Sequence, residues 1–180
     1  MGPVPTEPEI AEIAGLGANL YEYGTARGAG CTHAEVVKIA GLGANPAGYR
    51  VARNAGCSHA ECVEIAGLGG TLWDYREARD AGYGHVELVE VAGLGANLWA
   101  YLWARNAGYR HTELAEVARA GADLYWYRWA RQSGVEHRLL VDAVRVHGLP
   151  PGMLPMFAKR MAATPDADAA TIVFETVTGT

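Results

Sequence analysis

The sequence predicts an all-α protein, a right-handed α-solenoid of about five 26-residue helix-turn-helix repeats with a C-terminal capping helix. Ala-Arg pairs recur every 26 residues, the first at residues 26–27 and the last at 130–131. Apolar residues between the pairs follow helical spacing. Because one short helical hairpin cannot bury its own apolar face, several copies must stack to form a core. Four series share the period: Tyr23, Tyr49, Tyr75, Tyr101 and Tyr127; Arg27, Arg53, Arg79, Arg105 and Arg131; His33, His59, His85, His111 and His137; Glu9, Glu35, Glu61, Glu87 and Glu113.

Each repeat is expected to contain two helices with their own start and stop signals. In the first helix a hydroxyl residue precedes a glutamate by three positions, as in Thr32 with Glu35, which is a capping box. This helix ends at Gly-Leu-Gly, which stands at residues 15–17, 41–43, 67–69 and 93–95. The second helix opens at another capping position, occupied by Asn19, Asn45, Thr71, Asn97 and Asp123.

The pattern divides the chain into four parts. Residues 1–8 are polar and proline-rich and are expected to form an N-terminal cap, and residues 9–134 hold the tandem α-hairpin repeats. Residues 135–163 are expected to form a degenerate capping repeat and an amphipathic, methionine-rich helix that folds over the open end of the stack. Residues 164–180 are expected to be a flexible tail, in which the weak alternation of 171–178 fits either a strand or disorder.

The bulk composition excludes several classes of protein. The chain has 180 residues, of which 50% are hydrophobic and 19% charged, and this suits one globular domain. Its net charge of −5 disfavours an extended polyphosphate partner, and no apolar run is long enough to span a membrane. Three cysteines and the lack of an apolar leader predict a cytoplasmic protein. Without a phosphate-binding loop, a nucleophile beside a base or a complete ligand set, we expect no enzyme activity, no cofactor and no metal.

The histidine series admits two interpretations. The runs Cys31-Thr32-His33 and Cys57-Ser58-His59 would bring sulfur and nitrogen ligands of neighbouring repeats toward one metal ion. The cysteine disappears in later copies while His85 and His111 remain. This favours a structural role, in which each histidine lies in the first turn of its helix and hydrogen-bonds the adjoining loop.

The arginine and tyrosine series are also expected to be structural. The arginines lie in the last turn of the second helix, where a cation is favoured, and matching glutamates predict a ladder of ion pairs. Contact with phosphate is the alternative for these arginines. The tyrosines are expected to lie in the core with their hydroxyls reaching the surface.

Positions that vary between repeats are free to serve a ligand, and on the second helix they accumulate aromatic residues toward the C terminus. The expected contact residues are Trp73, Trp99, Trp103, Tyr125, Trp126 and Trp129. Clustered aromatic side chains are typical of binding hot spots. Three explanations stay open: contact with a partner or a second copy, packing against the methionine-rich C-terminal segment, and stacking on bases.

The stretch from Thr32 to Gly41, with the sequence THAEVVKIAG, resembles the first helix of the DNA-binding repeats of TAL effectors and their bacterial relatives, and so does 58–70. In that family a two-helix unit repeats along DNA, and the loop between the helices presents a base-reading residue. The resemblance covers about a dozen residues per unit and implies an α-solenoid. The unit here is shorter than the family's, and a loop that reads Gly-Leu-Gly in four copies cannot encode a sequence.

We therefore expect a non-enzymatic repeat scaffold that binds a protein or peptide partner, or a second copy of itself as a homodimer. The contact would be made through the second-helix face and the C-terminal aromatic cluster, without membrane contact. The alternative is a TAL-like nucleic-acid-binding repeat protein without a sequence-reading code. Its candidate contacts are Lys38, Arg50, Arg76 and Arg128.

Overall fold

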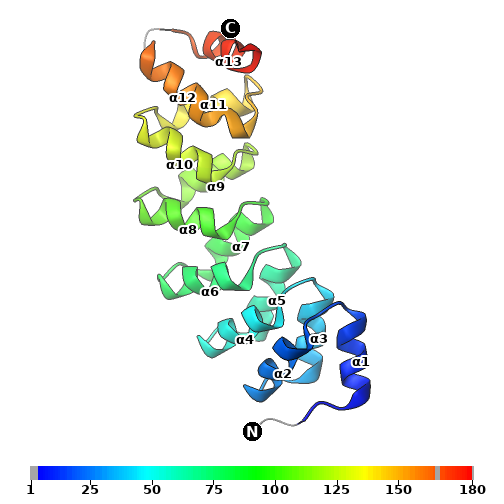
Figure 1. Ribbon diagram of the computed structural model, residues 1–180. Helices are drawn as coiled ribbons and strands as arrows, with labels where there is room; N and C mark the ends of the chain where they lie inside the picture. Colours follow the sequence, from blue (N-terminus) through cyan, green and yellow to red (C-terminus); the bar gives the residue numbers. More distant parts are fainter. Residues whose placement is uncertain (1–3, 165–166, 180) are drawn as a thin grey trace. The chain divides into compact units, whose positions relative to one another are not determined.

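The computed structural model describes residues 4–164 and 167–179, and these residues form helices joined by short loops, with no strand (Figure 1). The chain divides into two compact units, residues 1–93 and 94–180. In both units nine-residue helices of two alternating types recur every 26 residues. The predicted α-solenoid fold is confirmed.

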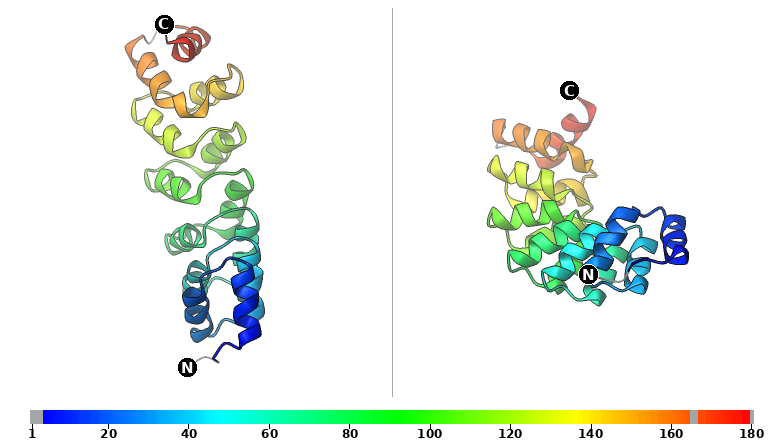
Figure 2. Two further views of the ribbon diagram at one scale, coloured as in Figure 1. Left: turned by 45° about the vertical axis from the view of Figure 1, so that its right-hand side comes forward. Right: turned by 60° about the horizontal axis from the view of Figure 1, so that its bottom comes forward.

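The first unit is a two-layered stack of helices. Its helices are α1 (Glu7–Gly15), α2 (Leu20–Gly28), α3 (His33–Gly41), α4 (Pro46–Asn54), α5 (His59–Gly67), α6 (Leu72–Asp80) and α7 (His85–Gly93). The odd-numbered helices form one layer, in which each contacts the next, and α2, α4 and α6 form the other (Figure 2). We call the first helix of each repeat first-type and the second helix second-type. The first-type helices α1, α3 and α5 also pack on the second-type helices α2, α4 and α6 that follow them, so each of these three pairs is an α-hairpin.

The second unit continues the same two types of helix. Its elements are α8 (Leu98–Asn106), α9 (His111–Arg119), α10 (Leu124–Gln132), α11 (His137–Arg145), the 3-10 helix η1 (Pro151–Met153), α12 (Leu154–Ala163) and α13 (Ala169–Thr178). Helices α8, α10 and α12 pack side by side as one layer, while α9, α11 and α13 form the other. This order makes α12 a second-type helix and α13 a first-type helix.

The helix ends are formed by the residues that the sequence assigned to them. The carboxylate of Glu35 accepts a hydrogen bond of 2.8 Å from the backbone N–H of Thr32, and the carboxylate of Glu61 accepts one of 2.7 Å from that of Ser58. The side chain of Asn45 accepts from the amide of Ala47 at 2.7 Å, at the start of α4. These contacts satisfy amides that a short helix otherwise leaves unpaired, and they offset the high cost of starting many short helices.

Three expectations for the chain ends are wrong. Residues 169–178, expected to belong to a flexible tail, form α13, which packs on α11 and α12. Asp168 caps this helix by accepting from the amide of Thr171 at 3.2 Å, and Ile172, Val173 and Thr176 are buried. Burial on one helical face therefore overrides the strand preference of the β-branched residues. Residues 165, 166 and 180 of the expected tail lie outside the described residues.

At the other end the proposed N-terminal cap is not a separate element. Helix α1 begins at Glu7, so residues 7–8 of the expected cap are already its first turn, and residues 1–3 lie outside the described residues. The methionine-rich segment does form a helix, α12, as expected. It continues the layer of α8 and α10 as a sixth second-type helix and does not fold across the end of the stack.

The two glycines of each Gly-Leu-Gly loop have different backbone requirements, and this yields a test of the fold. Gly43 has a φ of +76°, whereas Gly41 is the last residue of α3 and has open space around the position of a β carbon. We expect Gly43→Ala to destabilise the protein by about 1–2 kcal/mol because alanine is strained in the left-handed region. Gly41→Ala, the matched control, should stabilise by up to about 1 kcal/mol because alanine has the higher helix propensity. Urea unfolding followed by circular dichroism measures both, and equal signs would contradict the assigned backbone.

Candidate functional site

The recurring histidines and tyrosines are joined to each other inside the repeats. In every copy the hydroxyl of the second-helix tyrosine lies 2.9–3.1 Å from Nδ1 of the histidine ten residues later. The histidine is the first residue of the next first-type helix. The tyrosines are at most 1% exposed, so their expected position in the core is confirmed, whereas the expectation that their hydroxyls reach the surface is wrong.

In three of the histidines the second ring nitrogen, Nε2, contacts a glutamate of the preceding first-type helix. Nε2 of His33 lies 2.9 Å from the carboxylate of Glu12, and the pairs His85–Glu64 and His137–Glu116 are each 3.0 Å apart. A carboxylate only accepts, so Nε2 carries the proton and Nδ1 accepts from the tyrosine hydroxyl. The histidine thus links three helices, and its role is structural, although its partner is a tyrosine side chain and not the adjoining loop.

Three members of the arginine series form the predicted ion pairs. Arg27 lies 3.4 Å from Glu9, Arg53 lies 3.7 Å from Glu35, and Arg79 lies 3.6 Å from Glu61. A second amino group donates to a loop carbonyl, as in Arg27 to the carbonyl oxygen of Cys31 at 3.1 Å, and the bonds of Arg53 and Arg131 are equivalent. These guanidinium groups are engaged within the repeats, and this disfavours the alternative of phosphate contact.

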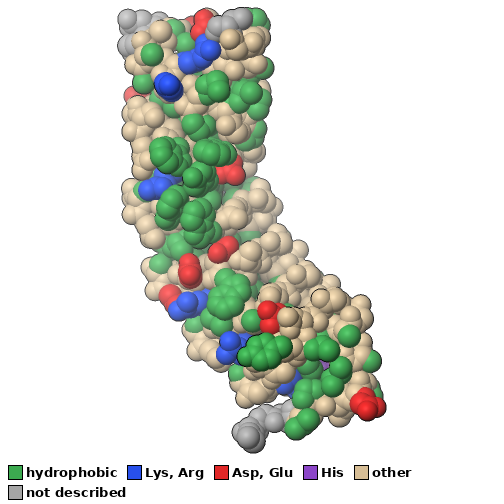
Figure 3. Space-filling model, viewed as in Figure 1, with side chains coloured by type: hydrophobic (Ala, Val, Ile, Leu, Met, Phe, Trp, Pro, Cys, Tyr) green, Lys and Arg blue, Asp and Glu red, His purple; other side chains and the backbone are tan. Residues whose placement is uncertain are grey.

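An aromatic cluster occupies the second-helix face of the second unit. We define it as Trp99 and Trp103 of α8 together with Tyr125, Trp126 and Trp129 of α10, and Figure 3 shows the corresponding apolar side chains gathered over these two helices. The four tryptophans are 37–49% exposed, although α12 of the C-terminal segment packs on α10. A substantial part of each ring therefore stays accessible to a partner.

The rings of the aromatic cluster hold one another in place. Trp99 and Trp103 stack with ring centroids 4.7 Å apart, and Trp103 is nearly parallel to Tyr125, with an interplanar angle of 7° and a centroid distance of 5.8 Å. The ring of Trp126 meets Tyr125 edge-on at 4.7 Å. Stacking across two helices fixes the side chains before any partner binds, which reduces the entropy that a partner would otherwise have to offset.

Arg128 belongs to this cluster, although the sequence assigned it to a different kind of contact. Its guanidinium carbon lies 4.2 Å from the centroid of the Trp103 ring, a cation–π contact between α10 and α8. Its Nε is buried without a hydrogen-bond partner. Sequence reasoning missed this placement because Trp103 and Arg128 belong to different repeats, and the periodic pattern of the second helix was the only available signal.

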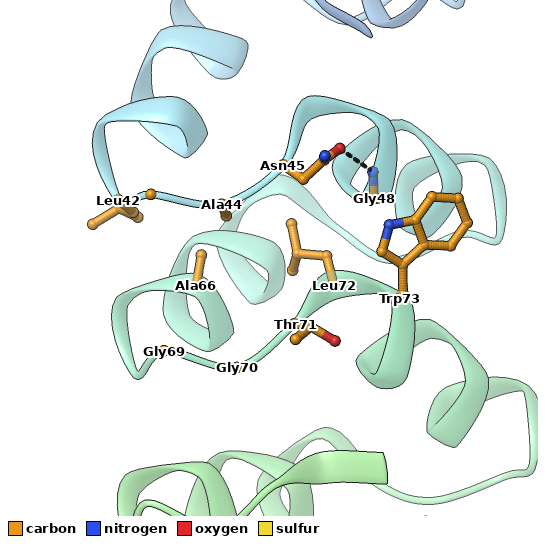
Figure 4. A pocket seen from close by; sticks show the side chains of 11 residues that line it. Leu42, Ala44, Asn45, Gly48, Ala66, Gly69, Gly70, Thr71, Leu72 and Trp73 are labelled. Carbon is orange, nitrogen blue, oxygen red and sulfur yellow. Dashed lines mark hydrogen bonds between the residues drawn. The ribbon is translucent and has the colours of Figure 1, made fainter. Parts of the chain in front are cut away.

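Trp73 lies in the first unit, on α6, and is described there by itself. Its indole lies beside Gly48 of α4 and borders a pocket of about 300 Å³ that is lined by the interhelix loops of two adjacent repeats (Figure 4). Similar hollows recur at equivalent loops, one lined by Leu16 and Pro46 and another by Leu94 and Asp123. Their recurrence follows from the glycine-rich loops and does not indicate a particular ligand.

The other candidate basic residues do not form one surface. Lys38 is an exposed residue of α3, in the first-helix layer, whereas Arg50 and Arg76 lie on α4 and α6 in the second-helix layer. Arg76 is paired with Asp80 at 2.6 Å. Arg50, like Arg76 and Arg128, has a buried Nε without a partner. The four candidate basic residues therefore lie in different helix layers and different units, and only Arg76 among them forms an ion pair within the described residues.

Other kinds of site find little support among the described residues. No group of three or more histidine, cysteine, aspartate or glutamate side chains is placed to hold a metal ion, and no described helix has the length and apolarity to cross a bilayer. The three cysteines are buried and unpaired, and burial raises the pKa of Cys62 to about 12. A thiol with a raised pKa is a poor nucleophile at neutral pH.

Comparison with known proteins identifies no relative, because no family model and no curated protein matches the chain.

The capping glutamates give a prediction about acid stability. The backbone amide of Ser58 lowers the pKa of Glu61 below its ordinary value of 4.5. Because the pKa is lowered in the folded chain, the ionised carboxylate stabilises the fold at neutral pH, and this stabilisation is lost as the pH falls below about 4.5. Glu61→Gln keeps a capping side chain but not the charge, so its melting temperature should fall less between about pH 7 and about pH 3. The exposed Glu77→Gln serves as control, and an equal flattening in that variant would contradict the capping role.

Proposed function

We propose that the protein is a non-enzymatic repeat scaffold that binds a protein or peptide partner through the aromatic cluster of the second unit. The observation that supports this most is the preformed stack of the exposed Trp99 and Trp103 on the half-buried Tyr125, on two adjacent helices with Arg128 against Trp103. Tryptophan, tyrosine and arginine are the residues most enriched at the energetic centres of protein interfaces.

The division between invariant and variable positions supports the same proposal. Tyrosine, histidine, arginine and glutamate of each copy are engaged with one another inside the repeats, so their polar groups are occupied. The aromatic cluster instead uses positions that change from copy to copy, such as 99 and 125, where the first copy has Tyr21 and the second Ala47. A position that is free of structural duty and accumulates large exposed rings is well suited to partner contact.

A nucleic-acid partner is the second candidate, and one feature favours it. Exposed, parallel rings beside an arginine are able to stack on bases, and Arg128 adds a cation for phosphate. The resemblance of the first helix to TAL-effector repeats also favours a nucleic-acid partner. Against it, the chain has a net charge of −5, and the Gly-Leu-Gly loop ends the helix at a left-handed glycine without presenting a varying side chain. We therefore favour a protein or peptide.

We further propose that the protein works in the cytoplasm without cofactor, metal or membrane contact. Its three cysteines are unpaired and buried, which agrees with a reducing compartment. Its tandem repeats use their titratable groups for packing between helices, and a catalytic site would have no need of several identical copies.

Selection from a random peptide library displayed on phage tests the proposed partner class. Selected peptides should bind the wild-type chain, and the double variant Trp103→Ala and Trp129→Ala should weaken binding at least tenfold, about 1.4 kcal/mol or more, because the exposed rings are removed. The matched control Phe174→Ala removes an exposed aromatic ring of α13, in the other helix layer of the second unit, and should change the affinity less than about twofold. Fluorescence anisotropy with labelled peptides measures both, and circular dichroism checks that the helices persist.

A nucleic-acid partner would give a different result. Labelled mixed-sequence DNA or RNA that binds at micromolar concentration, with affinity falling steeply as salt rises, would replace the proposed partner by a nucleic acid. Unfolding of the double tryptophan variant would show that the rings belong to the core, against their observed exposure.

A further inference from the structure

Charged side chains are segregated between the two helix layers of the second unit. Helices α8, α10 and α12, which form the layer with the aromatic cluster, contain basic residues and no acidic residue. The basic residues are Arg105, Arg128, Arg131, Lys159 and Arg160. Helices α9, α11 and α13 of the other layer carry the acidic residues Glu113, Glu116, Asp142 and Glu175. The layer with the aromatic cluster therefore has a positive local charge in a chain whose net charge is −5.

The repeat itself does not require this positive layer. In the first unit the second-type helix α6 contains Asp74, Glu77 and Asp80, and α2 contains Glu22. Glu77 occupies the repeat position that holds Trp103 and Trp129 in the later copies. Acidic side chains are therefore compatible with the second-type helix, and their replacement by aromatic residues is a property of the copies that form the aromatic cluster.

Two of the five basic residues have no carboxylate or carbonyl partner within the described residues and flank the exposed rings. The other three have contacts inside the chain: Arg131 with the carbonyl oxygen of Val135, Arg105 with the ring of Tyr101, and Arg160 with Glu175. The guanidinium of Arg128 lies on the ring of Trp103, and this contact leaves its charge uncompensated by an anion. Lys159 is exposed on α12.

Lys159 extends the surface of the aromatic cluster onto the next helix. Helices α10 and α12 pack side by side, and Tyr127 of α10 and Phe157 of α12, each the fourth residue of its helix, are both fully buried. This common buried position aligns the two helices, so Lys159 stands where α10 has Trp129. Met156, just before Phe157, is 50% exposed and adds apolar area. Because packed helices are about 8–10 Å apart, the ammonium group of Lys159 is within reach of a peptide that covers Trp129.

The one acidic side chain at the start of α10 is already engaged. The carboxylate of Asp123 accepts hydrogen bonds from the backbone amides of Tyr125 and Trp126, at 2.7 and 3.4 Å. These amides and the positive end of the helix dipole offset its charge. The charges that remain to be matched by a partner on this surface are those of Arg128 and Lys159.

We infer that the partner of the aromatic cluster is an acidic peptide segment with apolar side chains. This inference rests on the proposed function and names the chemistry of its partner. The apolar side chains of the peptide pack on Trp99, Trp103 and Trp129, while its carboxylates lie against Arg128 and Lys159. Charges of opposite sign around an apolar centre select a partner and speed its association.

The same surface suits a nucleic acid less well. Charges separated by more than about 8 Å are screened at physiological salt, so a short peptide responds to the local positive charge and not to the net charge of the chain. A longer polyanion extends over the acidic parts of the protein and needs many cations along its path. The faces of Trp99, Trp103 and Tyr125 also stack on one another, at centroid distances of 4.7–6.2 Å, which leaves less ring face for bases.

Fluorescence anisotropy with three labelled peptides tests the charge of the partner. The first consists of repeats of Glu-Ser-Phe-Glu-Leu, and in the other two every glutamate is replaced by glutamine or by lysine. The glutamate peptide should bind the whole wild-type chain at least about tenfold more tightly than the glutamine peptide and more tightly still than the lysine peptide. Its affinity should fall as NaCl rises from about 50 to about 500 mM, because salt screens the paired charges.

A charge reversal on α12 tests the position of the site. Lys159→Glu should weaken the glutamate peptide by about fivefold and strengthen the lysine peptide, because the exposed side chain then repels one and attracts the other. The matched control is Arg138→Glu, whose side chain is 90% exposed on α11 in the other layer. It changes the net charge equally and should alter either affinity less than about twofold. Circular dichroism checks that both variants keep their helices.

Failure of this inference and failure of the proposed function give different results. Peptides that bind regardless of their charge, lose affinity in the Trp103→Ala and Trp129→Ala variant and ignore Lys159→Glu would overturn the acidic partner and leave the proposed function standing. No binding by any of the three peptides, or binding that survives the loss of both tryptophans, would count against both. Displacement of the glutamate peptide by single-stranded DNA at lower concentration than by unlabelled peptide would assign the surface to a nucleic acid.

Discussion

A hydrogen bond between a buried tyrosine and the first residue of the next helix joins one repeat to the next throughout the protein. The tyrosine ring lies in the core, where an unpaired hydroxyl would cost several kcal/mol, and this hydroxyl is hydrogen-bonded to Nδ1 of the histidine ten residues later at 2.9–3.1 Å. The other ring nitrogen reaches a glutamate of the preceding first-type helix where one is present, as in His33 with Glu12. One side chain thus sets the distance between three helices.

The contacts of the histidines account for the constant 26-residue period up to Gly121 and for the longer spacing that follows it. The last tyrosine–histidine pair is Tyr127 with His137, and the left-handed glycines keep a spacing of 26 residues up to Gly121. Gly148, the next left-handed glycine of the series that follows the first-type helices, stands 27 residues after Gly121. An inserted residue at Gly121 would change the 21-residue separation of Glu116 and His137, whereas after His137 no such pair remains among the described residues. The chain then tolerates the 3-10 helix η1 and the prolines of its loop.

The sequence predicted most of the fold because the same local signals occur several times. Capping boxes, asparagine caps and left-handed glycines each act within a few residues, so their positions follow from spacing alone. Helix α13 was not predictable in this way, because its β-branched residues favour a strand locally and become helical through packing on α11 and α12. The partner of the histidine was missed for a related reason: it lies on another helix, and only the fold brings the two rings together.

The contacts within the aromatic cluster are also of two kinds: those that helical spacing predicts and those that only the packing of helices creates. Trp99 and Trp103 are four residues apart on one helix, so their proximity follows from helical spacing. Trp103 also contacts Arg128 and stacks on Tyr125, and both contacts depend on how α8 and α10 pack. The spacing of residues within one repeat does not predict these two contacts. An exposed leucine is in itself uninformative, since much of any protein surface is apolar. Leu20 carries information because Leu72 occupies the same position of another copy and is buried. The repeats supply a comparison that an isolated domain lacks, because the same side chain at the same position of two copies has different exposure.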